Sequence, residues 1–430
     1  MKFPMTLVEG EGRIVITERE GVVESVQYEI TEAPRFFEHI ARGKRPEFVV
    51  DLVSRVCGLC GVSYVYLAVK AFEKCYNIEI DPDIDEYRRI LHLAERVKSH
   101  SLHLFFMNIP AISGARSLIE LISRNPDFAK KALYIISYTR KLMSTLGGRF
   151  HNIVNMRIGG VYSLPRWDST EKILEETKRA LVVLNDVADV VLTLQPKLTR
   201  SVRVPQLCIK ASSEYPHHGA EVVLGDSYYT ISSFYGDIVR GVRKEYSTAT
   251  QYRVRGVESY ITGPVARFNK AYCKMLREVR ELLSTYGWKP PVSVFEGHVA
   301  RFAEIYNSLL LIQEYLENYK SKGATQLTTP PSPSTSSRVC EYAVEAPRGV
   351  LYHKYEIGED GRVQNCVIIT PTAQNLAAME DIATQIARGK PLSNDTVIVA
   401  KNTAVALDPC ISCAVHTLPV KLIRKRLSEN

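Results

Sequence analysis

Hydrophobic and polar positions alternate along residues 6–30, which is the pattern of a β-strand with one buried face. The alternation breaks at Glu20 and Gly21 and then resumes, so this segment predicts a β-hairpin. Apolar spacing over 32–43 predicts a short helix. The run of small and apolar residues over 61–71 predicts a helix buried on most of its surface.

Longer segments repeat their apolar positions every three or four residues, which is the period of an amphipathic helix. The first of them covers 83–107, and Pro110 is expected to end it. Four further ranges show the same period: 128–146, 169–194, 270–286 and 299–319. Several antiparallel helices packed around a common core are therefore predicted.

The remaining segments have other patterns. Residues 201–241 are rich in Tyr, Ser and Gly and are expected to be irregular, and 325–337 contain three prolines among Ser and Thr, as in a surface connection. Residues 349–370 predict two strands joined at 359–362. A helix is expected to follow over 375–388.

Together these elements predict an α+β fold that is mainly helical, with a bundle of long helices between two lobes that contain β-strands. We expect one domain over 1–416, divided into an N-terminal lobe 1–80, a helical bundle 81–324, a connection 325–338 and a C-terminal lobe 339–416. Each lobe carries one Cys-x-x-Cys (CxxC) motif, at Cys57–Cys60 and Cys410–Cys413. The fold must bring these two motifs together if they act at one site.

Composition narrows the choice of function. The chain has 430 residues, of which 45% are hydrophobic, and a net charge of +8 carried by dispersed Lys and Arg, so binding to nucleic acid is not indicated. The sequence shows neither a secretory signal nor a transmembrane segment, and we expect a cytoplasmic location. Five of the nine cysteines lie outside the CxxC motifs at irregular spacing, and we interpret them as small buried residues in a reducing compartment: Cys75, Cys208, Cys273, Cys340 and Cys366.

Two CxxC motifs offer four thiolates, and four kinds of site use such a set. A structural zinc site is one possibility, although its two halves usually lie much closer in sequence than these. An iron-sulfur cluster fits the same ligands. Thioredoxin-like chemistry needs a βαβ setting that neither motif has. A catalytic metal centre that joins the two ends of the chain is the fourth possibility.

The residues around the cysteines are more specific than the motifs themselves. The first motif reads Arg55-x-Cys-Gly-x-Cys60 and the second Asp408-Pro-Cys-x-x-Cys-x-x-His416. Further landmarks follow in order: Val8–Arg13, Phe36–Glu38, Ser99–His103, Gly263–Arg267, Ala346–Gly349 and Pro371–Thr372. With these motifs the chain resembles the large subunit of nickel-iron hydrogenases, and in particular their cytoplasmic NAD(P)-coupled branch, which includes the sulfhydrogenases. The homologous subunit of respiratory complex I lacks the four cysteines.

The resemblance implies a role for each cysteine. Cys57 and Cys410 correspond to terminal nickel ligands, whereas Cys60 and Cys413 correspond to thiolates that bridge nickel and iron. The iron of such a centre also carries carbon monoxide and cyanide. Thiolates suit nickel, which agrees with this division.

Further site residues follow from the same resemblance. Arg348 corresponds to the arginine above the open metal position, with Asp408 and Pro347 beside it, and Thr372 corresponds to a residue that binds a cyanide ligand. Glu9 matches the glutamate that takes the proton from the terminal cysteine, here Cys410.

A second metal ion is also implied, with Glu38, His416 and the carbonyl of Ile368 as its ligands. Magnesium is the usual ion in the family, and another divalent ion fits a histidine ligand equally well.

Two positions depart from the family's pattern. Tyr64 stands where a histidine is common, and its hydroxyl is expected to hydrogen-bond a thiolate. Ser99 stands where an aspartate is common, so one carboxylate near Arg348 is lost.

The resemblance also implies partners and a maturation step. A small iron-sulfur subunit is expected, because no further cysteine motif remains to hold the clusters that carry electrons, and a flavin subunit for NAD(P) and a ferredoxin-like subunit are expected with it. Nickel chaperones and an endopeptidase that removes residues 417–430 are expected during maturation. The alternative is a non-catalytic scaffold or electron-transfer subunit of the complex I type, with a structural four-cysteine metal site.

Overall fold

A computed structural model describes residues 1–115, 118–153, 155–196, 198, 202–256, 259–319 and 337–415. Almost all of the predicted connection 325–338 lies outside these residues, as do His416 and the predicted tail 417–430. Within the described part of the chain, no helix is long and apolar enough to cross a membrane.

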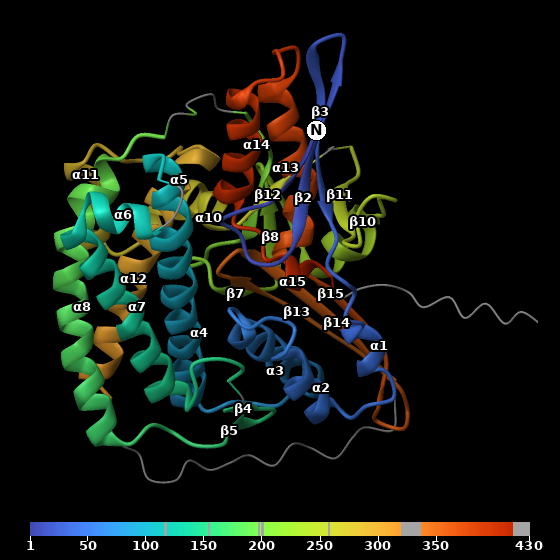
Figure 1. Cartoon of the computed structure of the whole chain (residues 1–430). Helices are drawn as coiled ribbons and strands as arrows, with labels where there is room; N and C mark the ends of the chain where they lie inside the picture. Colours follow the sequence, from blue (N-terminus) through green and yellow to red (C-terminus); the bar gives the residue numbers. More distant parts are fainter. Residues whose placement is uncertain are drawn as a thin grey trace, which may run out of the picture.

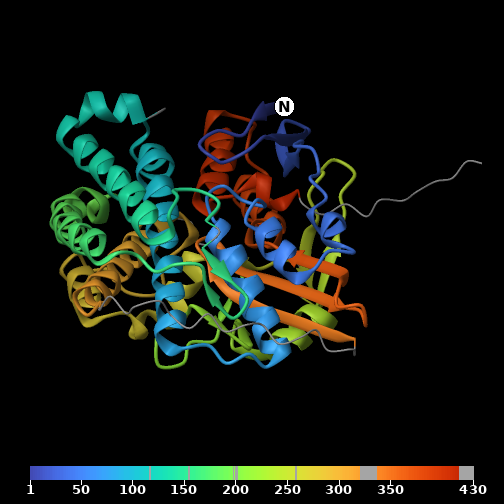
Figure 2. The same ribbon diagram turned by 90° about the horizontal axis from the view of Figure 1, so that it is seen from below.

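Four long helices form a layer on one side of the molecule (Figure 1). They are α4 (Pro82–His103), α7 (Pro126–Gly147), α8 (Trp167–Thr193) and α12 (Gly297–Glu317). Helix α12 packs against α4 and α8, and α7 packs against the same two helices, so the four enclose a common core. The predicted bundle is confirmed, and Figure 2 shows this layer beside the sheets.

Two predicted helix boundaries are wrong. Helix α4 does not end near Pro110 but continues through a π-helical turn, Leu104–Asn108, into α5 (Ile109–Ser113). Pro110 follows the π-helical turn directly, in the first turn of α5.

The segment predicted as one helix over 270–286 contains two helices. They are α10 (Pro264–Ala271), followed by a 3-10 turn (Tyr272–Lys274), and α11 (Arg277–Thr285). The chain leaves the helical path between them because Asn307 Oδ1 on α12 accepts the backbone N–H of Leu276 at 2.9 Å.

The N-terminal lobe begins with the predicted hairpin, which is confirmed. Strands β1 (Lys2–Pro4), β2 (Gly12–Arg19) and β3 (Val22–Ile30) form an antiparallel sheet in that order. The helices after it are α1 (Phe37–Ala41), α2 (Pro46–Val53) and α3 (Gly61–Tyr76). Helix α3 is the buried helix that the sequence predicts after the first CxxC motif.

The C-terminal lobe contains a four-stranded sheet in the order β15-β14-β13-β7. Its strands are β7 (His218–Gly219), β13 (Arg338–Ala346), β14 (Gly349–Ile357) and β15 (Val363–Ile369). Helices α13 (Pro371–Ala387), α14 (Asn394–Leu407) and α15 (Ile411–Ala414) follow. Helix α3 of the N-terminal lobe packs against β13 and β14, which brings the two lobes into contact.

The expectation that 201–241 is irregular is wrong. Strands β6 (Gln206–Ile209), β8 (Glu221–Leu224), β9 (Ser227–Thr230) and β12 (Ile261–Thr262) form a second four-stranded sheet. Strand β10 (Val239–Val242) pairs with β11 (Gln251–Val254), and β4 (Met156–Arg157) pairs with β5 (Gly160–Val161). These strands have two to four residues, too few for alternation to identify them in sequence. Short helices α6 (Leu118–Arg124) and α9 (Ile231–Ser233) complete the fold.

A disulfide bond joins Cys75, near the end of α3, to Cys340 on β13. The interpretation of these two residues as unpaired buried cysteines is therefore wrong, and Cys273 is exposed rather than buried. Cys208 and Cys366 are buried and free, as predicted. The disulfide links the helix after the first CxxC motif to the strand that leads to Arg348, and so fixes the two lobes to each other.

This bond gives a first testable prediction. In the denatured, metal-free chain without reductant, seven of the nine cysteines are expected to react with a thiol reagent. Cys75→Ser is expected to lower the free energy of unfolding by about 2–5 kcal/mol, because it removes a long-range cross-link. Cys273→Ser is the matched control and should leave the melting temperature unchanged. Nine reactive thiols in the wild-type chain would contradict the assignment.

Candidate metal centre

The first CxxC motif lies between α2 and α3 in a turn shaped around the sulfur of Cys57. The backbone N–H groups of Leu59 and Cys60 donate to Cys57 Sγ at 3.3 and 3.1 Å. Cys60 is the N-cap residue of α3, and Gly61 follows it where a Cβ atom would stand 2.7 Å from the carbonyl oxygen of Ser54. The sequence Cys-Gly-Leu-Cys-Gly therefore folds into a tight turn that directs both thiols inward.

The second CxxC motif follows α14. Asp408 ends this helix in the left-handed conformation with φ 49°, which turns the chain through Pro409 into Cys410. The backbone N–H of Cys410 donates to Thr372 Oγ1 at 2.9 Å. The N–H of Ile411 donates to the carbonyl oxygen of Glu9 at 3.0 Å. The motif is thus docked against both α13 and the N-terminal segment.

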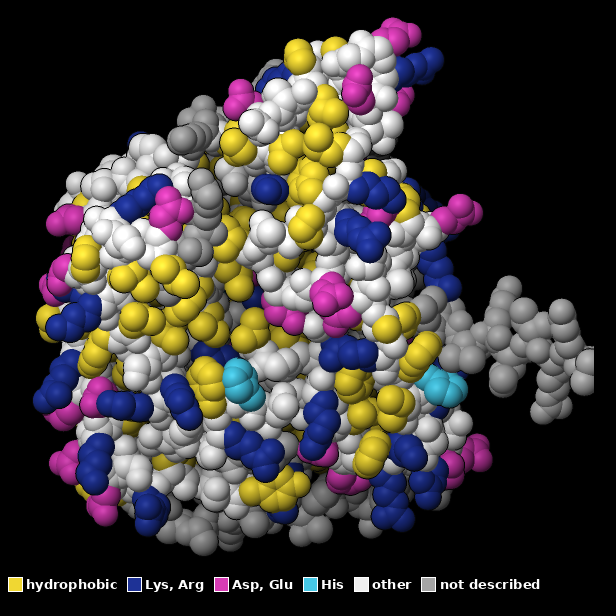
Figure 3. Space-filling model, in the orientation of Figure 1, with side chains coloured by type: hydrophobic (Ala, Val, Ile, Leu, Met, Phe, Trp, Pro, Cys, Tyr) yellow, Lys and Arg dark blue, Asp and Glu magenta, His cyan; other side chains and the backbone are white. Residues whose placement is uncertain are grey.

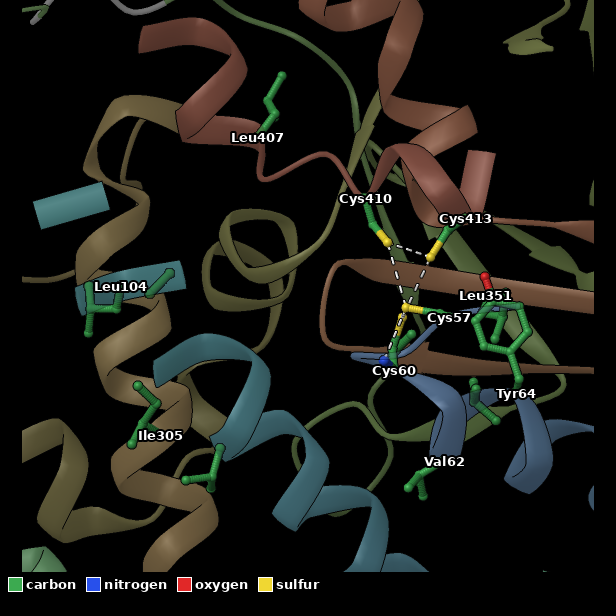
Figure 4. Close-up of a cluster of buried hydrophobic side chains, with 14 of the residues drawn as sticks. Cys57, Cys60, Val62, Tyr64, Leu104, Ile305, Leu351, Leu407, Cys410 and Cys413 are labelled. Atoms are coloured by element: carbon green, nitrogen blue, oxygen red, sulfur yellow. Dashed lines mark hydrogen bonds between the residues drawn. The ribbon is translucent and has the colours of Figure 1, made fainter. Parts of the chain in front are cut away.

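The fold brings the four thiols together, as the sequence predicts. All four sulfurs lie within 4.8 Å of one another, and the two motifs are connected by distances of 3.6 Å between Cys57 and Cys410 and 3.8 Å between Cys60 and Cys413 (Figure 4). The cysteines are 1–4% exposed and belong to the main hydrophobic core.

The donor set fits a soft transition metal. Burial alone would disfavour the Cys57 thiolate, but hydrogen bonds from the other three thiols and the charge of Arg348 lower the pKa of Cys57 well below its ordinary value. Four converging buried sulfurs, one of them readily ionised, are a ligand set for nickel, iron or zinc. Among the described residues, this is the one group of His, Cys, Asp or Glu side chains that converges in this way.

Arg348 stands at the tip of a two-residue hairpin between β13 and β14, where Ala346 pairs with Gly349. The φ of Gly349 is +136°, and a Cβ atom there would lie 2.5 Å from Thr262, so this turn requires glycine. Arg348 is 4% exposed. The tight turn holds its guanidinium group in the interior, beside Asp408.

The guanidinium of Arg348 makes three hydrogen bonds. Its Nε donates to the carbonyl oxygen of Asp408 at 3.0 Å and its Nη2 to Asp408 Oδ1 at 3.1 Å, and its Nη1 donates to Ser99 Oγ at 3.2 Å. The hydroxyl of Ser99 thus accepts a hydrogen bond from Arg348, although it brings no negative charge. Burial raises the pKa of Asp408, and the charge of Arg348 opposes that effect.

A buried ion-pair network supports this turn from behind. Arg267 on α10 binds Glu304 through two hydrogen bonds of 2.7 Å and Glu345 through one of 2.8 Å. It also donates to the carbonyl oxygen of Pro347 at 2.9 Å. Pro347 therefore positions the hairpin through its backbone, next to Arg348.

Glu9 lies beside the second motif and is half-buried. Its Oε1 accepts the hydroxyl of Ser412 at 2.5 Å, and its Oε2 accepts the N–H of Ser412 at 3.2 Å. The carboxylate thus lies where the buried centre approaches the surface. Glu11, two residues further on, is exposed.

The residues predicted for a second metal ion are placed only in part. Glu38 Oε1 accepts the backbone N–H of Ile368 at 2.6 Å, so these two predicted ligands are neighbours. Burial raises the pKa of Glu38 to about 7. His416, the third predicted ligand, lies outside the described residues.

Tyr64 points toward the cysteines from α3 (Figure 4). Its ring packs against His353 with 5.5 Å between centroids, and its buried hydroxyl has no hydrogen-bond partner among the described residues. Burial and the nearby cysteines, Cys413 first, raise its pKa well above the ordinary value. The expected hydrogen bond from the Tyr64 hydroxyl to a thiolate is therefore not formed in the part of the chain that the structure describes.

Sequence reasoning missed three residues of the site. Arg267 was noted only as part of a motif, and Ser412 and Arg35 were not noted at all. Arg35 donates to backbone carbonyl groups next to both motifs. The contacts of Arg35 go to backbone atoms, and those of Arg267 and Ser412 include acidic side chains far away in the sequence, so no local spacing signals them.

Taken together, the fold and the site define a protein in which the two ends of one long chain build a buried four-thiolate metal centre beneath an arginine. A sequence model described as "Nickel-dependent hydrogenase" matches residues 35–111 and 214–416, which is more than half of the chain. The chain belongs to the nickel-dependent hydrogenase family, whose members are oxidoreductases.

Individual relatives agree with this assignment. Sulfhydrogenase 2 subunit alpha of Pyrococcus furiosus is 29% identical over 433 residues, which cover 96% of this chain and 97% of that one. NAD-reducing hydrogenase HoxS subunit beta of Cupriavidus necator is 24% identical and covers 96% of this chain and 94% of its own. A crystal structure of an NAD+-reducing [NiFe]-hydrogenase has the same fold, with a TM-score of 0.85 at 21% identity over 97% of this chain and 99% of that one.

Proposed function

We propose that the chain is the catalytic subunit of a nickel-iron hydrogenase that interconverts dihydrogen with protons and electrons. The observation that carries this proposal is the convergence of four buried thiols from opposite ends of the chain in a member of this family. Cys57 and Cys410 would be terminal ligands, and Cys60 and Cys413 would bridge the two metals. A nickel-iron centre held there would supply the redox chemistry and, through carbon monoxide and cyanide on the iron, the necessary ligand field.

The proton leaves through the chain's own groups. The Sγ atom of Cys410 accepts a proton as dihydrogen is divided, and the carboxylate of Glu9 receives it next. Glu9 and Cys410 pair through their backbones in an isolated parallel β-bridge, and Ser412 hydrogen-bonds the Glu9 carboxylate, so the two residues are neighbours, which supports this route. The half-buried position of Glu9 places the proton within reach of solvent.

Arg348 and the residues that hold it would orient dihydrogen at the metal centre. A guanidinium group cannot lose its charge, so it provides a fixed positive charge and spare donors in a buried site. Asp408 and Ser99 hold the group in place from one side and the Pro347 turn from the other. The hydroxyl oxygen of Thr372 accepts a hydrogen bond from the backbone N–H of Cys410. The hydroxyl proton of Thr372 is therefore free to donate to a cyanide ligand.

Electrons are expected to leave near the first motif. Gly58, between the two cysteines, is exposed, and the Nδ1–H of the exposed His151 donates to its carbonyl oxygen at 2.7 Å. Only one residue thus separates the buried Cys57 from the surface. We propose that a small iron-sulfur subunit covers this face, with flavin and ferredoxin-like subunits for NAD(P) beyond it, since the relatives above are subunits of larger hydrogenases.

One face of the molecule carries hydrophobic side chains that gather on the helical layer and below the projecting hairpin (Figure 3). Large exposed apolar areas are typical of surfaces that partners cover. The magnesium ion, the nickel chaperones and the removal of residues 417–430 stay predictions from the resemblance. The cytoplasmic location stays a prediction from the sequence.

Metal analysis of the native complex tests the proposed function. We expect one nickel per chain, with iron in excess of it because of the partner's clusters. The complex I-like alternative predicts a structural metal, so zinc without nickel would overturn the hydrogenase proposal. Treatment with a strong chelator after reduction should remove nickel and hydrogen-dependent dye reduction in parallel.

A further inference from the structure

We propose that Arg35 is a positioning residue that fastens the two metal-binding segments to each other. We call residues 54–60 the first ligand loop and residues 408–415 the second ligand loop. The inference deepens the proposed function, since it explains how the candidate nickel-iron site stays closed. Its geometry, however, holds for any metal that the four thiols bind.

The contacts of Arg35 reach both loops. Its Nη2 donates to the carbonyl oxygen of Val56 at 2.6 Å and also to the carbonyl oxygen of Ser412. Its backbone N–H donates to the carbonyl oxygen of Val415 at 2.9 Å. Val56 directly precedes Cys57 and Ser412 directly precedes Cys413, so one guanidinium group holds the backbone next to a thiol in each loop.

The surroundings of Arg35 keep its side chain in this position. The guanidinium carbon lies 5.2 Å from the centre of the Phe37 ring, which provides a cation-π contact. The side chain is half-buried, so water competes less for its donors than at an open surface. The Nη2 group carries two N–H donors at fixed angles in the guanidinium plane, so it can bind two carbonyl groups at once, and lysine lacks this planar geometry.

The other described contacts of the second ligand loop lead elsewhere. Cys410 binds Thr372 on α13, and Ile411 and Ser412 bind Glu9 in the N-terminal segment. Among the described hydrogen bonds outside the thiols, those of Arg35 are the ones through which a single side chain bridges the two loops. Without them, the described hydrogen bonds that join the loops directly would be those between the thiols.

Thiol accessibility in the metal-free, full-length chain tests the inference. We would measure the alkylation rate of each cysteine by peptide mass spectrometry in wild type, R35Q and R35K. In R35Q the rates at Cys410 and Cys413 are expected to rise about tenfold or more, since charge-assisted hydrogen bonds are lost. R35K should give a smaller rise, because one ammonium group restores part of the attraction.

Two internal controls separate a local effect from general loosening. Cys208 and Cys366 are buried, and both lie far from the two ligand loops in the sequence. Their alkylation rates in R35Q should therefore equal those in wild type. The matched variant R42Q removes an arginine whose described hydrogen bond goes to Asn365, and should leave the rates at Cys410 and Cys413 unchanged. Equal rates in R35Q and wild type, a parallel rise at Cys208 and Cys366, or a wild-type Cys410 that already reacts as in the denatured chain would each overturn the inference.

The measurement also separates this inference from the proposed function. If the native complex holds zinc instead of nickel, the hydrogenase proposal fails, but the effect of R35Q on the loops is still expected. If nickel is present and R35Q leaves the alkylation rates unchanged, only the role of Arg35 is refuted.

Discussion

Replacing Glu9 with glutamine is expected to lower hydrogen-driven dye reduction by at least about 100-fold, because proton transfer by a positioned side chain typically contributes 10²–10⁴-fold. Glutamine has nearly the same shape, and its carbonyl oxygen can still accept a hydrogen bond from Ser412. The variant therefore removes the proton acceptor while it keeps one of the two contacts to Ser412. Nickel and iron contents are expected to equal those of the wild-type complex.

Two matched variants sharpen this prediction. Glu11→Gln removes a neighbouring exposed carboxylate and should leave the rate within about twofold of wild type, as surface changes usually do little. Glu9→Asp keeps the acid but shortens it, and should recover part of the activity. If Glu9→Gln keeps full activity with normal metal content, the proton leaves by another route.

Replacing Arg348 with lysine is expected to lower activity by about 10²–10³-fold, the effect seen when one preorganised electrostatic group is removed. Arg348 uses three nitrogen atoms to bind Asp408 twice and Ser99 once. Lysine has one nitrogen, so the charge remains but its position is lost. Because the four thiols do not depend on Arg348 for their backbone contacts, the metal content should stay close to that of wild type.

Ser99→Ala provides a graded comparison at the same site. It removes the hydroxyl that accepts from Arg348 Nη1 but leaves both contacts to Asp408, so the loss should be below about tenfold. A Ser99→Ala effect as large as that of Arg348→Lys would mean that the serine has a role of its own. Full activity in Arg348→Lys would contradict the role proposed for the guanidinium group.

The sequence predicts an element well where its pattern of apolar positions repeats many times. The helices α4, α7, α8 and α12 span more than five turns each, and so their apolar positions repeat often enough to be recognised. The hairpin of β2 and β3 was recognisable for the same reason. The CxxC motifs could be predicted to meet because four thiolates of one site must converge.

Features that depend on tertiary contacts could not be predicted in this way. The break before Leu276 follows from a single amide oxygen on α12, and the disulfide pairs two cysteines that are 265 positions apart. The role of Arg35 depends on two backbone carbonyl groups, which every residue has. The resemblance to a known family supplied the roles of Glu9 and Arg348, and the fold supplied their partners, Ser412 and Ser99.

The separation between the two motifs has a thermodynamic consequence. Cys57 and Cys410 are 353 positions apart, so a metal bound to both closes almost the whole chain into a ring. Because the Cys75–Cys340 disulfide already spans 265 of these 353 positions, the metal closes a further ring of about 90 residues, for which the chain-entropy relation for cross-links gives about 4–5 kcal/mol of stabilisation. The metal at this centre would then be a structural cross-link as well as a reactive group. Its loss would lower the free energy of unfolding of parts of the protein far from the thiols that bind it.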